Sequence, residues 1–229
     1  MRISGSVFSW VGVALFGLLT SCAAPSGSGG VRTVAGLRDP GIIAIVPFFV
    51  SQLESKDQGL VRCPKCMEYT AAGEVLAEGP QVITRLFRQG LITKGHDLVP
   101  PDAVASTFFA IREQGQEPEI LAQQLASEIE ANSVLMGWIF RYAERVGSAW
   151  GARKPASVAF AVFLFDGRGR LLWRGKFDET QEALSENVLK LGSFVRRGGR
   201  WLTAEQLAAD GVGLTLLTFP GGEAEQVNR

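Results

Sequence analysis

The chain has 229 residues, of which 46% are hydrophobic, so it is long enough to bury one sizeable core. Lysine plus arginine number 23, as do aspartate plus glutamate, and this balance excludes the strongly basic surface that nucleic-acid binding needs. We therefore expect one folded domain that binds no DNA or RNA.

The first 21 residues have the pattern of an export signal. Arg2 supplies a positive start, and residues 7–19 form an apolar run shorter than the roughly 20 residues of a membrane span. The run ends in the sequence LTSC, and this ending resembles the lipobox of bacterial lipoproteins. That resemblance implies cleavage before Cys22 and acylation of this cysteine, which would anchor the chain in a membrane. The alternatives are an ordinary cleaved signal or an uncleaved anchor in which the cysteine is incidental.

The residues after Cys22 predict where the chain lies and where its domain begins. Residues 23–30 (AAPSGSGG) are small, polar or helix-breaking, which is typical of a flexible tether. Lipoproteins that stay in the inner membrane often carry Asp after the cysteine, so Ala23 favours the periplasmic face of the outer membrane. We predict a signal at 1–21, a lipidated tether at 22–38, a folded domain at 39–220 and a disordered tail at 221–229.

Four elements are predicted in the first half of the domain. Residues 42–50 (IIAIVPFFV) are β-branched and aromatic and predict a buried strand. Residues 51–73 show no period and predict a loop. Gly79 and Pro80 favour a helix start, with a stop at Gly90. Residues 96–99 predict a short strand, and a helix is expected to follow from residue 101 to about 111.

The second half continues with a helix from Pro118 to about residue 129. Residues 134–142, 158–166 and 171–179 predict three strands, and the middle one is apolar on both faces, as in the centre of a sheet. The sequence DGRG at 166–169 predicts a hairpin turn. Thr203 and Gln206 form a capping box at the start of a helix that ends near residue 217.

The predicted order β-α-β-α-α-β-β-β-α gives an α/β (α+β) fold. We expect a single domain with a mixed sheet of about five strands and helices packed on it.

Four segments resemble a group of bacterial envelope lipoproteins: IIAIVPF, GHDLVPPDAV, LASEIEANSVLMGWIFRY and VAFAVFLFDGRGRLLWRGKFDET. They are similar to the TolB amino-terminal domain, curli-secretion lipoproteins and penicillin-binding-protein activator lipoproteins. Asn132 stands where this group usually has Asp. The resemblance covers most of residues 39–180. Residues 184–217 lie outside it and are predicted to be a helical extension added to the domain. The resemblance implies a periplasmic domain that contacts other envelope proteins, and homo-oligomers are one form such contacts could take.

Cys63 and Cys66 form a lone CxxC pair, because lipidation would consume Cys22. A zinc site would need His96, the single histidine, together with a carboxylate or a second chain. A redox site would place Cys63 at a helix amino terminus directly after a strand, and the long aperiodic stretch before it argues against this. We favour a local disulfide, or a reduced pair in a tight turn. His96 itself is expected at the surface.

Three arginines and one tryptophan are the candidates for an interaction surface. Arg196, Arg197 and Arg200 lie in the sequence RRGGR, which could bind an anionic group or could be a solvated loop. Trp150 lies in a predicted loop and is the tryptophan that we expect to be exposed, whereas Trp138 and Trp173 are expected in the core.

The sequence contains no motif of a known catalytic site in a supporting context. We therefore expect no enzyme and no cofactor. The expected function is a lipid-anchored outer-membrane protein that binds envelope proteins in assembly, secretion or cell-wall regulation. The alternative is a periplasmic thiol-disulfide or metal-binding protein that uses Cys63 and Cys66.

Overall fold

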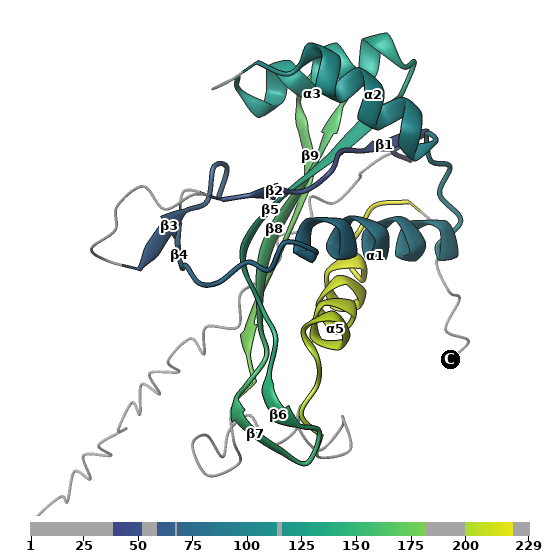
Figure 1. Cartoon of the computed structure of the whole chain (residues 1–229). Coiled ribbons are helices and arrows are strands. Elements are labelled where there is room, and N and C mark those ends of the chain that lie inside the picture. Colours follow the sequence, from purple (N-terminus) through teal and green to yellow (C-terminus); the bar gives the residue numbers. More distant parts are fainter. Residues whose placement is uncertain (1–38, 52–58, 67, 114–115, 182–199, 222–229) are drawn as a thin grey trace, which may run out of the picture. The chain divides into compact units, whose positions relative to one another are not determined.

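The computed structural model describes residues 39–51, 59–66, 68–113, 116–181 and 200–221 (Figure 1). A five-stranded sheet of order β1-β5-β8-β9, with β2 also pairing to β5, forms the centre of this part. The strands are β1 (Ile43–Ile45), β2 (Phe49–Val50), β5 (Ser133–Ala143), β8 (Ser157–Asp166) and β9 (Leu171–Thr180). β1 and β2 run parallel to β5, whereas β5, β8 and β9 are antiparallel to their neighbours. The predicted mixed α/β fold is therefore confirmed.

Helices cover both faces of the sheet. The four described helices are α1 (Gly79–Thr93), α2 (Pro101–Ile111), α3 (Pro118–Glu128) and α5 (Ala204–Leu216). Residues of α1 and α5 share one hydrophobic core with one face of the sheet, and residues of α2 and α3 share a second core with the other face. In Figure 1, α1 and α5 accordingly lie together, apart from α2 and α3.

β8 is central, as its apolar sequence predicted. Nine of its ten residues are buried, because alternate side chains enter opposite cores. Phe160 and Val162 pack beneath α1 and α5, whereas Ala161 and Phe163 belong to the core of α2 and α3. The strand therefore contributes packing residues to both cores.

The first predicted strand is interrupted at Pro47. Val46 still donates its N–H to the carbonyl of Leu135, at 3.0 Å, but proline has no N–H to give. Phe48 then donates its N–H to Thr84 Oγ1 of α1, at 3.1 Å, instead of to a strand. The interruption divides residues 42–50 into β1 and β2.

Two small hairpins lie where the sequence predicted loops. β3 (Leu60–Arg62) pairs with β4 (Tyr69–Ala71), and β6 (Val146–Ser148) pairs with β7 (Gly151–Lys154). Strands of three or four residues are too short to show a period, which explains why the pattern missed them. Conversely, the strand predicted at 96–99 is reduced to an isolated bridge between Leu98 and Ile43.

α5 begins at the predicted capping box and belongs to the main core. Thr203 Oγ1 accepts the N–H of Gln206, and the Gln206 side chain accepts the N–H of Thr203. Seven of its residues are buried: Ala204, Leu207, Ala208, Gly211, Val212, Thr215 and Leu216. The segment at 184–217, expected as an extension, thus supplies one of the helices that close the first core.

Candidate functional site

Three of the predicted site residues cannot be placed. Cys22, Arg196 and Arg197 lie outside the described residues, so their roles stay predictions. Within the described residues, no helix is both long enough and apolar enough to span a membrane.

The CxxC pair forms the turn of the β3–β4 hairpin. Cys63 and Cys66 are joined as a disulfide, with their Cα atoms 5.3 Å apart, and the Cys66 N–H points to Cys63 Sγ at 3.1 Å. Cys63 is fully buried in the core of α2 and α3, whereas Cys66 is half-buried against it. The pair therefore lies in a hairpin turn that packs on the sheet, and neither cysteine belongs to the first turn of a helix.

Charged residues beside the disulfide fasten the hairpin to two other elements. Lys65 lies 2.7 Å from Glu119 and 3.1 Å from Glu117 at the start of α3. Burial acts to lower the pKa of Lys65, but these two carboxylates raise it overall above its usual value. Glu68 lies 3.2 Å from Lys176 of β9. This arrangement fits a structural turn better than a redox site, which needs an accessible cysteine.

His96 is buried, so the expectation of a surface histidine was wrong. Its side chain is 8% exposed and meets the Phe219 ring edge-on, at 5.2 Å between ring centres. It lies on the side of Phe219 and Trp173, away from the core that holds Cys63. Among the described residues, no three histidine, cysteine or carboxylate side chains group as a metal site.

The structure brings Trp150 and Arg200 together. Trp150 lies between β6 and β7 and is 73% exposed, and the Arg200 guanidinium lies 4.8 Å from the centre of its ring. The Trp201 N–H donates to the carbonyl of Ala149 at 2.9 Å, and Arg145 donates to the Trp201 carbonyl. Trp150 and Arg200 were both candidates from the sequence. Their contact joins residues that are distant in the sequence, so no local pattern predicts it.

Trp138 and Trp173 lie on the sheet as predicted. Trp173 is buried against Phe219, and Trp138 stacks half-buried on Phe49, with ring centres 5.2 Å apart. These tryptophans serve packing.

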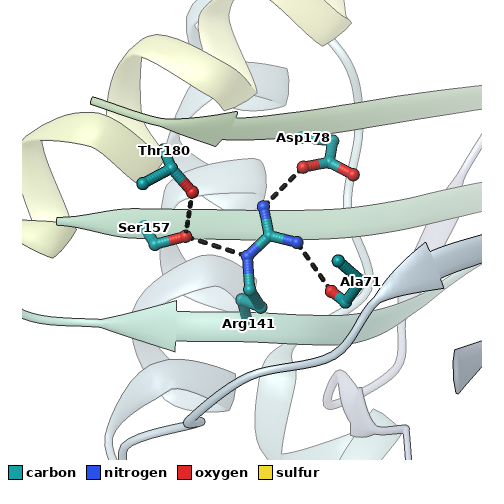
Figure 2. A network of polar contacts seen from close by, with 5 residues as sticks. All are labelled: Ala71, Arg141, Ser157, Asp178 and Thr180. Carbon is teal, nitrogen blue, oxygen red and sulfur yellow. Dashed lines mark hydrogen bonds and ion pairs between the residues drawn. The ribbon is translucent and has the colours of Figure 1, made fainter. Parts of the chain in front are cut away.

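A pocket that the sequence did not indicate lies at the base of the β6–β7 hairpin and is lined in part by Arg141, whose polar contacts are drawn in Figure 2. Arg141 Nε donates to Ser157 Oγ at 2.8 Å, one terminal nitrogen donates to the Ala71 carbonyl at 2.6 Å, and the other contacts Asp178 at 2.5 Å. Ser157 and Thr180 share a hydroxyl hydrogen bond of 2.6 Å. The guanidinium thereby joins β5 to three other strands, β4, β8 and β9.

The pocket has a volume of about 480 Å³ and a rim of mixed charge. Its lining residues are Ala71, Gly73, Glu74, Arg141, Ala143, Lys154, Pro155, Ser157, Asp178 and Thr180. Lys154 and Glu74 lie 3.5 Å apart on the rim. The polar side chains of this lining are hydroxyls, carboxylates, one lysine and one arginine, all of which can donate or accept hydrogen bonds to a bound group. A lone arginine between Phe140 and Tyr142 is the signal that could have identified it.

Comparison with known proteins finds similar folds at low identity. The chain matches no family model, and no curated protein matches it. A PelC dodecamer from Paraburkholderia phytofirmans is 12% identical, with 78% of this chain and 88% of that chain covered and a TM-score of 0.44. Lipoprotein GNA1162 from Neisseria meningitidis is 17% identical, with 70% and 94% covered and a TM-score of 0.42. The LpoB C-terminal domain from Salmonella enterica is 15% identical, with 64% and 87% covered and a TM-score of 0.38.

Proposed function

We propose that this chain is a lipid-anchored protein of the bacterial outer membrane, without enzymatic activity, whose periplasmic domain binds envelope proteins. The observation that carries the proposal is the export signal ending in LTSC, with the small-residue tether after it. Acylation of Cys22 would hold the domain at the membrane, since several acyl chains anchor stably where one does not. Ala23 after the cysteine supports the outer membrane.

The contact surface that fits this function is the β6–β7 hairpin with the pocket at its base. Lys154 belongs to the hairpin and also lines the pocket, so the two are continuous. Trp150 offers a large exposed ring, and the exposed Arg200 stacks its guanidinium on that ring. Tryptophan and arginine are the residue types that most often dominate protein interfaces. The adjoining pocket of mixed charge would then accept polar groups of the partner.

Lipid anchoring and partner binding are tested on the full chain in cells. Cys22→Ala should move the protein from the membrane fraction to the soluble periplasm and abolish labelling by a fatty-acid analogue. Trp150→Ala should reduce partner recovery after crosslinking about 10-fold or more, as expected for an interface anchor. Tyr69→Ala is the matched control, because Tyr69 is also an exposed aromatic residue but lies on the other hairpin. Unchanged labelling of Cys22→Ala, or equal losses for both aromatic variants, would contradict the proposal.

A further inference from the structure

The outer edge of β9 is open within the described part of the chain. β9 is the last strand in the sheet order and pairs with β8, and no other described strand pairs with it. Its register with β8 is unbroken from Trp173 to Thr180, after a shift near Leu172. A regular, extended edge of this kind presents unpaired N–H and C=O groups to which a further strand can add.

The two faces of β9 differ in character. Trp173 and Phe177 are buried beneath α5, and Gly175 lies against Thr215 of that helix. On the other face the exposed residues Arg174, Lys176 and Asp178 follow one another at alternate positions. A strand that joins this edge therefore has apolar neighbours on the face covered by α5 and charged neighbours on the opposite face.

We propose that the open edge pairs antiparallel with β9 of a second copy of this chain, around a two-fold axis at Phe177. In this register Lys176 lies opposite Asp178 of the partner subunit, and the symmetry repeats the pair. Arg174 is then the diagonal neighbour of Asp178 of the partner subunit, within reach of a long side chain. Both cations of the edge thus approach Asp178 of the partner subunit, whose carboxylate also contacts Arg141 of its own chain at 2.5 Å, and no like charges lie directly opposite.

α5 contributes an apolar surface above the same edge. Val212 and Leu216 face Gly90 of α1, on the inner side of the helix. Leu214 of α5 and Leu217, which directly follows the helix, are 56% and 74% exposed, and their helical spacing places them away from the side that faces α1. Because α5 packs on β9, pairing of the two β9 edges would bring the α5 helices of both copies toward each other on one face of the joined sheet. The second copy would bury these leucines.

A second copy suits the edge better than an unrelated strand. Charges and apolar residues complement themselves under the two-fold operation, which a heterologous partner would have to match independently. Lys176 also has a partner in its own chain, Glu68 at 3.2 Å, so its ammonium is held in position on this face. This inference goes beyond the proposed function and does not depend on lipidation.

The test uses the full chain extracted from membranes in mild detergent, with the protein mass measured by light scattering. Wild type should be a dimer or a larger assembly built of dimers, with an even number of chains. Lys176→Glu and Asp178→Lys each place like charges opposite one another, and each should weaken self-association about 10-fold or more. Co-expression of the two variants should restore association, because every introduced charge then faces an opposite one.

Two controls separate pairing from folding. Glu68→Gln removes the ion pair that Lys176 makes within its chain but leaves the edge unchanged, so this variant should associate like wild type. Thermal unfolding identifies any variant that has lost its fold, and restored association on co-expression cannot come from unfolded chains. A monomeric wild type, single variants that associate like wild type, or a mixture that stays monomeric would each overturn the proposal. The Cys22→Ala chain should associate like wild type, so the result is independent of the anchor.

Discussion

At the scale of single residues, His96 shows how burial changes the chemistry of a side chain. Its Nε2 atom is buried and has no hydrogen-bond partner among the described residues. Burial lowers the pKa of His96 below its ordinary 6.5, and Lys94 adds to this, although the charges of Asp39 and Asp97 oppose it. The folded chain therefore favours neutral imidazole, which packs against Phe219.

We predict that the free energy of unfolding falls as the pH is lowered and His96 takes up a proton. Between the lowered folded pKa and the ordinary value the unfolded chain binds more protons, so stability is present above about pH 6.5 and is lost as the pH falls through the folded pKa. His96→Phe removes this titration. Urea unfolding at about pH 7.5 and about pH 5 should show the variant gaining stability relative to wild type at the lower pH. An equal difference at both pH values would contradict the prediction.

At the scale of elements, the glycines of α5 have opposite roles although they lie two residues apart. A Cβ at Gly211 would overlap the Phe177 ring of β9, whereas a Cβ at Gly213 would meet nothing within 4 Å. Gly211 thus permits the close approach of helix and strand, and Gly213 only lowers the helix propensity.

Alanine substitutions at these two glycines should therefore change stability in opposite directions. Gly211→Ala should lower the free energy of unfolding by about 1 kcal/mol or more, since overpacking outweighs the gain in helix propensity. Gly213→Ala should raise it by about 0.4–1 kcal/mol. Chemical denaturation of both variants measures the difference, and a stabilising Gly211→Ala would show that Phe177 moves aside freely.

The same logic explains which elements could be predicted from the sequence. The long strands and the helices, of which three have a proline in their first two positions and one begins at a capping box, have patterns that local chemistry determines, and they were found. The sequence predicted a helix stop at Gly90, but α1 continues to Thr93. Gly90 instead serves packing, since a Cβ at this position would overlap Leu216 of α5. The Arg141 pocket and the contact of Trp150 with Arg200 depend on residues distant in sequence, and no local pattern contains that information.

At the scale of the whole molecule, one sheet divides two cores that are closed by different parts of the chain. The core of α2 and α3 is completed by the disulfide hairpin, whose ion pairs reach α3 and β9. The core of α1 is completed by α5, which comes last among the described helices. Since α5 lies beyond the envelope-lipoprotein resemblance at residues 39–180, that resemblance alone leaves the first core open.

We predict that the chain cannot fold without α5. A chain that ends at Gln181 would expose the face of β8 and β9 that carries Phe160, Trp173 and Phe177, a large apolar patch that drives aggregation. It should be recovered in aggregates, or should lack the near-ultraviolet circular dichroism of packed aromatic residues. The matched control ends at Gly221 and retains α5, so it should give the spectrum and the melting transition of the full chain. A soluble, cooperatively folding chain ending at Gln181 would show that α5 is an appendage and that the domain ends with β9.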